Sequence, residues 1–450
     1  MFTVILIESR LRSSLQSCLL LHPSPPKIRR HPLKSLRRQY HATSILTMSP
    51  TVAIIHKRKT TPPPAPVNKR IRNVVPAYKD SSEEEKYGVV QREFYPPEMT
   101  NERCLLYNTD VIPRPIKVLD AALRETKQER ERIQVKDAVV HWFKWDLRTR
   151  DNKALHFASE KAKSKGVPLI CLHIISPQDY QAHLTSPVRV DFALRTLEVL
   201  KEDLGKLDIP LYVETVEKRK TVPNRVIELC EQWGARHIFA NIEYEVDELR
   251  REALMTRKCL EKGIAFTALH DTCAVAPGEL ASQQGRQYAV YSPWFRSWIA
   301  HLHSHPEQLD LYEVPGKNPA DARTKFKEDF ESTIPTAPEN KKLTDEEKQR
   351  FRSMWPPGEH EGQQRLEKFL SQKVGKYKDA RNFPASNSTA MLSVHFSAGT
   401  LSARTAIHCA RDVNTTNKLD GGNPGIVNWI SEVAWRDFYK HVLAHWPYVW

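Results

Sequence analysis

The segment AVVHWFKWDLRTRDNKALHFASEKAKSKG, residues 138–166, decides the fold class of this 450-residue chain. It opens with a short, mostly apolar run, which is typical of a β-strand buried on both faces. A charged stretch follows, and then a helical pattern that ends at Gly166, a residue type that often stops helices. This β-then-α unit is the building block of a parallel sheet covered by helices.

Similar units follow along the chain. Short apolar runs that predict further strands occupy residues 168–175, 209–213, 237–241 and 264–269. Helical patterns separate them, such as VPNRVIELCEQWG, which has Pro223 near its start and Gly234 after its end. A helix is also predicted over residues 115–132, ahead of the first strand. We therefore predict an α/β fold with a parallel, doubly wound, Rossmann-like sheet, in which ligands bind beyond the carboxyl ends of the strands.

The positive charge of the chain lies near its start. The formal net charge is +14, and residues 1–79 hold 15 Lys and Arg against one acid, Glu8, which leaves 53 basic and 53 acidic residues elsewhere. Bulk charge therefore gives no reason to expect DNA binding by the folded part. The seven cysteines include no C-x-x-C pair and indicate reduced thiols. No apolar run reaches the roughly 18 residues that a membrane span needs, so we expect no membrane partner.

The first residues of the chain contain two candidate targeting signals. Residues 1–47 are rich in Arg and Ser, as mitochondrial presequences are, although a leader ahead of a second start at Met48 is the alternative. The basic clusters HKRK (residues 56–59) and NKRIR (residues 68–72) flank a Pro-rich spacer, which predicts a bipartite nuclear signal or a solvated basic tail. We expect delivery to nucleus and mitochondrion, from starts at Met48 and Met1.

Polar residues crowd the ends of two predicted strands, whereas neither G-x-G-x-x-G nor a P-loop occurs. After the first strand, Asp146 and Arg148 predict an ion pair, and Asp151 or Asn152 predicts a helix cap. The stretch NIEYEVDELRRE, residues 241–252, follows the fourth strand. Its polar side chains either hydrogen-bond a heteroaromatic ligand or cap the next helix, and they are Asn241, Glu243 and Tyr244.

A polar loop, residues 376–404, opens the last part of the chain. Thr389, Leu392 and Ser393 lie at a predicted helix start. The free N–H groups and hydroxyls there either bind a diphosphate or serve only in ordinary capping of the helix.

The helix predicted in NWISEVAWRDFYKHV, residues 428–442, carries two stripes. The apolar stripe is predicted to face the core and consists of Ile430, Ala434, Phe438 and Val442. The second consists of Glu432, Trp435, Arg436 and Tyr439. This second stripe either receives extruded bases on an aromatic wall beside a carboxyl group, or is a solvent-facing surface with a Glu432–Arg436 ion pair.

Four motifs resemble the DNA photolyase and cryptochrome family, most closely fungal class I cyclobutane pyrimidine dimer photolyases. They are VHWFKWDLRTRDNKAL (residues 140–155), NIEYEVDELRRE, QYAVYSPWFRSW (residues 287–298) and the stretch from GEHEGQQRLEKFL (residues 358–370) to the end. The resemblance covers about residues 110–450. Two positions depart from the family pattern: Lys144 replaces an arginine, and the Ala390-Met391 pair lacks a hydroxyl.

The resemblance implies a domain order. It comprises a basic targeting region (1–79), an extension (80–135), an α/β antenna domain (136–300), a charged connector (301–354) and part of an all-helical FAD-binding domain (355–450). Because family members continue past this point, we expect either a truncated gene model or an inactive fragment.

The resemblance also implies a light-driven deoxyribodipyrimidine photo-lyase, in which reduced FAD passes an electron to a cyclobutane dimer. The alternatives are a cryptochrome-like photoreceptor and an inactive fragment. FAD is expected at Tyr377, Thr389, Leu392, Ser393 and Arg436. The antenna chromophore 5,10-methenyltetrahydrofolate is expected at Asn241 and Glu243, and Glu432 and Trp435 are expected to contact the lesion as the catalytic pair. UV-damaged DNA is the expected partner of a monomer without a metal.

Overall fold

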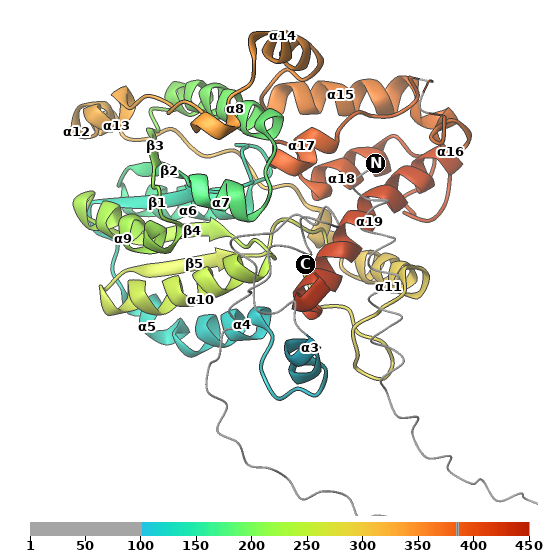
Figure 1. Ribbon diagram of the computed structural model, residues 1–450, viewed down its shortest axis with the longest axis horizontal. Coiled ribbons are helices and arrows are strands. Elements are labelled where there is room, and N and C mark those ends of the chain that lie inside the picture. Colours follow the sequence, from blue (N-terminus) through green and yellow to red (C-terminus); the bar gives the residue numbers. More distant parts are fainter. Residues whose placement is uncertain (1–100, 384, 386, 450) are drawn as a thin grey trace, which may run out of the picture. The chain divides into compact units, whose positions relative to one another are not determined.

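Five parallel strands form the sheet of this computed structural model (Figure 1), which describes residues 101–383, 385 and 387–449. The strands are β1 (Ala138–Phe143), β2 (Leu169–Ile175), β3 (Leu211–Thr215), β4 (Ala235–Asn241) and β5 (Ala265–Leu269). Their order is β3-β2-β1-β4-β5, and every pairing is parallel. The predicted doubly wound α/β fold is confirmed. The predicted targeting signals lie outside the described residues.

The two faces of the sheet are covered by different helices. Successive side chains of a strand point to opposite faces, and Val139 and Phe143 of β1 pack with α6 (Lys153–Lys165) and α8 (Pro187–Lys206). Val140 and Trp142 point to the other face. That face is covered by α4 (Pro115–Glu125), α9 (Val222–Gln232) and α10 (Val246–Glu261). Burial on both faces explains why β1 reads as a continuous apolar run.

Local signals set the ends of several helices. Asn152 caps α6 by accepting a hydrogen bond from Leu155 N, which confirms one of the two predicted caps, and Gly166 ends the helix at φ 64°. The helix predicted over residues 115–132 is split at Thr126 into α4 and α5 (Lys127–Arg132). The Thr126 hydroxyl donates to Ala122 O at 2.7 Å, an interaction that commonly bends helices.

The remaining described elements are α-helices and short 3-10 helices that lie before, between and after the strands. They are α3 (Asn101–Asn108), α7 (Pro177–Ala182), η2 (Arg219–Thr221), α11 (Tyr291–Ser304), η3 (Pro306–Leu309), α12 (Ala322–Lys325), α13 (Lys327–Glu331), η4 (Glu339–Lys341), α14 (Asp345–Met354), α15 (Glu359–Gln372), η5 (Val374–Lys376), α16 (Tyr377–Ala380), α17 (Ser393–Ala398), α18 (Ala403–Asp412), α19 (Pro424–His445) and η6 (Pro447–Val449).

Long-range hydrogen bonds tie distant segments to this frame. Asn318, in the charged connector, bonds both Leu169 N and Leu169 O at 2.8 Å and so holds the start of β2. Near α3, Arg114 Nε donates to His445 O at 2.8 Å, and the Tyr448 hydroxyl donates to Asn108 Oδ1 at 2.7 Å. The first described residues therefore cap the end of α19.

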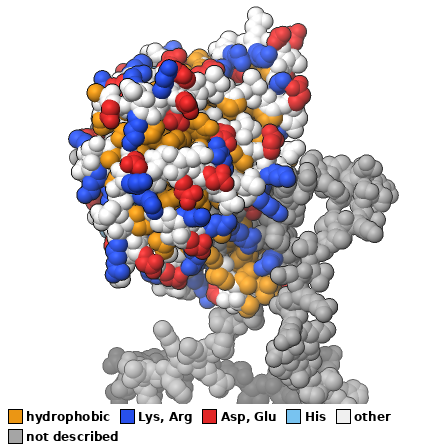
Figure 2. All heavy atoms as spheres, turned by 90° about the vertical axis from the view of Figure 1, so that its left-hand side faces the viewer, with side chains coloured by type: hydrophobic (Ala, Val, Ile, Leu, Met, Phe, Trp, Pro, Cys, Tyr) orange, Lys and Arg blue, Asp and Glu red, His pale blue; other side chains and the backbone are white. Residues whose placement is uncertain are grey.

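The surface is mixed in charge. Figure 2 shows basic and acidic side chains interspersed over the face that carries α12 and α13, in keeping with the balanced charge after residue 79. Among the described residues, no helix is both long and apolar enough to cross a membrane.

Candidate functional site

The charged motif after β1 joins the sheet to the helical part of the chain. The predicted Asp146–Arg148 ion pair is wrong, because Arg148 instead pairs with Asp271 and donates to Gly399 O at 3.0 Å. Asp146 accepts hydrogen bonds from Lys144 N at 2.7 Å and from the side-chain amide of Asn152 at 3.2 Å. Spacing within one loop could not show that the partner of Arg148 comes from the loop after β5.

Four buried charges form one cluster there, namely Arg148, Asp151, Asp271 and Arg404. Arg404 Nη2 lies 2.7 Å from both Asp151 Oδ1 and Asp271 Oδ1. Burial alone would raise the pKa of Asp271, but Arg148 and Arg404 outweigh it and lower that pKa to about 2. The cluster therefore ties α18 to the sheet through buried ion pairs.

A close backbone approach places α17 beside the same motif. Leu147 N donates to Ala398 O at 3.2 Å, and Gly399 ends α17 at φ 72°. A Cβ at Gly399 would lie 2.1 Å from Trp145 O, so only glycine fits. The segment that leads into α17, where three FAD contacts were predicted, is thus positioned by the sheet.

The predicted FAD residues of this segment differ in exposure. The helix start predicted around Thr389 to Ser393 is confirmed, because α17 begins at Ser393. Leu392 is buried, Thr389 is half-buried and Ser393 is exposed. Tyr377 is buried at the start of α16, where its ring meets the Phe369 ring at 5.2 Å.

A groove of about 600 Å³ runs beside this segment. One wall is formed by Asn387, Thr389, Ala390 and Met391, and the other by polar side chains of α15. Nearby, the buried Trp429 ring lies 6.1 Å from the Tyr377 ring, and Trp429 Nε1 has no hydrogen-bond partner among the described residues.

Helix α19 carries its two stripes as predicted. Ile430, Ala434, Phe438 and Val442 are buried, and Glu432, Trp435, Arg436 and Tyr439 are half-buried. The predicted Glu432–Arg436 ion pair is wrong. Glu432 pairs with Arg381, whereas Arg436 Nη1 donates to Thr272 O at 2.6 Å.

Two further polar residues of α19 were not predicted. Asp437 is buried and accepts a hydrogen bond from Ala274 N at 2.7 Å. Burial raises its pKa to about 6, against the opposing effect of Arg436. His441 is also buried and lies 2.8 Å from Val275 O. The i, i+4 spacing of Asp437 and His441 within the core face was the available signal, and both residues anchor α19 to the loop after β5.

Trp435 lies in an aromatic cluster with α11. Its ring is stacked on the Tyr291 ring, with centroids 3.5 Å apart and planes 9° apart. The Tyr439 ring is also stacked against it, with planes 28° apart, and the Phe438 ring meets it edge-on, each with a centroid distance of 5.6 Å. Tyr291 was not singled out as a site residue, although the aromatic-rich stretch QYAVYSPWFRSW was one of the motifs.

Beside the charged motif after β1, Asn241 has a structural role. Its Oδ1 accepts from Ala154 N at 3.1 Å, and its Nδ2 donates to Asp146 at 2.7 Å and to Asn152 at 2.8 Å. The Tyr244 hydroxyl pairs with His270 Nδ1 at 2.7 Å. The alternative that these residues cap α10 is wrong, because Glu245 is its N-cap residue and makes no side-chain cap.

Glu243 belongs to a buried ion-pair network. It lies 3.0 Å from Arg251 and 3.6 Å from Lys144, which also pairs with Glu252. Burial raises the pKa of Glu243 to about 7, and the two cations only partly offset it. Lys144 therefore supplies a buried cation to both carboxylates.

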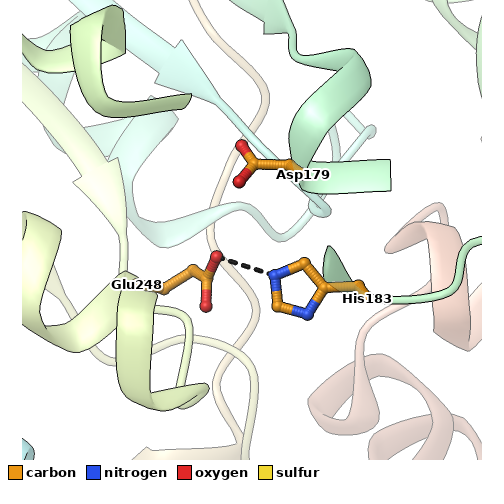
Figure 3. Close-up of side chains that lie close together, drawn as sticks. All are labelled: Asp179, His183 and Glu248. Atoms are coloured by element: carbon orange, nitrogen blue, oxygen red, sulfur yellow. Dashed lines mark hydrogen bonds and ion pairs between the residues drawn. The ribbon is translucent and has the colours of Figure 1, made fainter. Parts of the chain in front are cut away.

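Next to this network, Asp179, His183 and Glu248 converge from α7, its end and α10 (Figure 3). His183 Nε2 lies 3.0 Å from Glu248 Oε1, and Arg219 lies 2.7 Å from Asp179 and 3.6 Å from Glu248. Because the guanidinium group already neutralises the carboxylates, this trio is an ion-pair cluster rather than a set of free metal ligands. None of the three was predicted as a site residue.

Buried polar atoms without a partner gather in this region. Within the described part of the chain, Arg189 Nε, Glu248 Oε2, Arg251 Nε and Glu252 Oε2 have no hydrogen-bond partner. Such atoms are rare in a folded interior and indicate an additional polar group, either a ligand or water. This region therefore suits a bound polar ring better than the surroundings of Asn241 do, because the Asn241 amide already has all its hydrogen-bond partners within the protein.

Comparisons with known proteins agree on one family. The family model described as DNA photolyase matches residues 139–312. The chain is 58% identical to the deoxyribodipyrimidine photo-lyase of Neurospora crassa, over 87% of this chain and 65% of that protein. It is 27% identical to the mitochondrial deoxyribodipyrimidine photo-lyase of Saccharomyces cerevisiae, over 81% of this chain and 66% of that protein. It thus spans slightly less than two thirds of either relative.

Solved structures show the same fold. A bacterial class III photolyase from Agrobacterium tumefaciens superposes with a TM-score of 0.56 at 22% identity, covering 70% of this chain and 60% of that one. A Synechocystis cryptochrome superposes with a TM-score of 0.55 at 20% identity, covering 69% of this chain and 62% of that one.

Proposed function

Because the chain belongs to the DNA photolyase family, we propose that the protein is a deoxyribodipyrimidine photo-lyase that splits cyclobutane pyrimidine dimers in UV-damaged DNA under light. The observation that carries this proposal is the half-buried stripe of α19, which presents an indole and a carboxylate one turn apart, at Trp435 and Glu432. A lesion that has left the DNA stack needs both groups.

Trp435 and Glu432 have separate roles in this proposal. The indole offers a stacking surface to an extruded pyrimidine, and such stacking stabilises binding by about 1–3 kcal/mol per base. Arg381 holds Glu432 through its Oε1. We assign Glu432 Oε2 to the edges of the two pyrimidines, where it would hydrogen-bond the dimer while its rings separate.

We assign the FAD site to the segment between α16 and α17 together with α19. The exposed hydroxyl of Ser393, the half-buried Thr389 on the groove and the unpartnered Trp429 Nε1 beside Tyr377 fit a large polar cofactor. Thr389, Leu392 and Ser393 would hold the diphosphate of the cofactor, and Tyr377 and Arg436 would hold the rest of it. A reduced flavin bound there supplies the one-electron chemistry of dimer splitting.

The antenna chromophore, which we propose is 5,10-methenyltetrahydrofolate, belongs beside Glu243 rather than Asn241. The Asn241 amide is fully engaged within the protein, whereas Glu248 and Arg251 each carry an unpartnered buried atom. The carboxylates would accept hydrogen bonds from the amino groups of a pterin ring, and Arg251 would donate to its carbonyl oxygen.

We further propose that the protein acts as a monomer in both DNA-containing compartments. The Saccharomyces cerevisiae relative is named as mitochondrial. The basic clusters at residues 56–59 and 68–72 are those expected of a nuclear signal.

The test is repair itself. The purified 450-residue chain is mixed with a duplex oligonucleotide that contains one thymine dimer, and the dimer is quantified by chromatography after blue light and after darkness. Loss of the dimer in light alone is expected. Photoreduction of bound flavin with the dimer intact would identify a cryptochrome-like photoreceptor, and a chain without flavin absorbance would identify an inactive fragment.

A further inference from the structure

One face of the Trp435 indole is already covered by a residue of α11. Tyr291, the first residue of α11, lies parallel to Trp435 with ring centroids 3.5 Å apart and planes 9° apart. So short a centroid distance leaves little lateral offset between the rings. Two isolated rings favour offset or edge-to-face packing over such an overlap, so other contacts must hold the pair together.

Those contacts come from both helices. The Tyr291 hydroxyl donates to Ser431 O at 2.8 Å and lies 2.8 Å from Ser431 Oγ, one turn before Trp435 on α19. The Tyr291 ring also stacks on Phe295 at 5.4 Å and meets the Phe438 ring edge-on at 5.6 Å. Tyr291 is therefore fixed in place by contacts independent of Trp435.

A fixed wall favours recognition of an extruded base. An indole that is free to rotate must be ordered when the base arrives, which weakens binding, whereas a ring ordered during folding avoids that cost. A base also needs one open face, because it can stack on only one side of the wall. Tyr291 orders the Trp435 ring by covering one of its faces, and the Trp435 side chain as a whole remains only half-buried.

We propose that Tyr291 is a positioning residue for lesion recognition: it backs the Trp435 ring, fixes its plane, and leaves the opposite face for the pyrimidine. This inference rests on the proposed function and extends it to a residue that touches Trp435 rather than the substrate. It also predicts that α11, which follows the sheet domain, shapes the lesion pocket.

Binding to DNA tests the proposal without any need for turnover. Anisotropy is measured for the 450-residue chain with a labelled duplex that carries one thymine dimer and with the same duplex undamaged, below the melting temperature of every variant. Tyr291→Leu should weaken binding to the damaged duplex by about 3- to 10-fold and leave the undamaged duplex unaffected. Tyr291→Phe keeps the stacked ring and should restore most of the preference. Tyr212→Leu, which removes a half-buried tyrosine that packs against Trp233 on the sheet and touches neither α11 nor α19, is the matched control and should resemble the wild type.

Near-ultraviolet circular dichroism supplies a second measurement. The stacked pair should give a band that both Tyr291→Leu and Trp435→Phe remove. Equal weakening toward both duplexes, or an equally severe Tyr212→Leu, would make Tyr291 an ordinary core residue and overturn the proposal. Tighter binding by Tyr291→Leu would also overturn it, because Tyr291 would then occupy the face that the base needs.

Failure of the proposed function remains distinguishable. A wild-type chain without preference for damaged DNA contradicts the proposed repair activity. In that case circular dichroism alone tests whether Tyr291 fixes the Trp435 ring. Loss of the band in Tyr291→Leu supports this contact, and an unchanged band refutes it.

Discussion

Asp271 and Asp437 are buried aspartates whose pKa values move in opposite directions, so the same substitution at each should have opposite effects. Asp271 lies between Arg148 and Arg404, and its pKa is lowered to about 2. Asp437 accepts a backbone hydrogen bond from Ala274, and burial raises its pKa to about 6. Asp271→Asn should destabilise the fold, whereas Asp437→Asn should be neutral or stabilising near pH 7.

The magnitudes follow from these pKa values. Relative to 3.8, the ordinary value for aspartate, the lowered pKa of Asp271 corresponds to about 2 kcal/mol of stability at neutral pH, and the raised pKa of Asp437 to a cost of about 3 kcal/mol. Asp271→Asn also leaves two arginines facing one carboxylate, and breaking a buried pair typically costs about 3–5 kcal/mol. An asparagine at 437 keeps an oxygen that can accept from Ala274 N.

The pH dependence gives each residue its own signature. The folded pKa of Asp271 lies below its unfolded value, so its contribution is complete above about pH 4 and is lost as the pH falls toward 2. The folded pKa of Asp437 lies above its unfolded value, so its cost is absent below about pH 4 and appears as the pH rises through 6.

Urea unfolding of the wild type and both variants, followed by tryptophan fluorescence from pH 3 to 8, measures these differences. The Asp437→Asn advantage should shrink as the pH falls below 6, and the Asp271→Asn defect should shrink only below about 4. Equal shifts of the same sign in both variants at pH 7 would refute the assignment of opposite electrostatic roles.

Three further outcomes are expected. Trp435→Ala should weaken binding to dimer-containing DNA by about 1–3 kcal/mol in an anisotropy titration while flavin absorbance after purification is retained; equal loss of both would make Trp435 a core residue. Gly399→Ala should lower the melting temperature by several degrees or prevent folding, because its Cβ would lie 2.1 Å from Trp145 O; an unchanged melting temperature would show that the loop yields. Glu248→Gln should reduce the amount of near-ultraviolet chromophore that copurifies, with the melting temperature as control, and full retention of the chromophore would place the antenna elsewhere.

Local patterns predicted the parts of the fold that local physics determines. The five strands were predicted within a few residues because each is an apolar run bounded by helix stop signals. The core stripe of α19 and the start of α17 at Ser393 followed from helical periodicity and polar composition. In each case the deciding interaction lies within one element or its immediate neighbours.

Partners from distant segments could not be predicted in the same way. Arg148 pairs with Asp271 and Glu432 with Arg381, although a closer residue of suitable charge stands near each in the sequence. Asn241 at the end of β4 was read as a ligand contact, but its amide faces the loop after β1. Spacing identifies which groups carry charge, whereas only the packed tertiary structure determines which of them meet.

The cap on α19 has a consequence for the order in which the chain folds during synthesis. Arg114 and Asn108 bond to His445 and Tyr448, so they cannot reach these partners until residues 445–448 have emerged from the ribosome. This segment is synthesised first among the described residues, but it is therefore among the last to form its native contacts. A nascent chain arrested before residue 445 should expose this segment to protease, and extension of the chain beyond residue 448 should bring its protection.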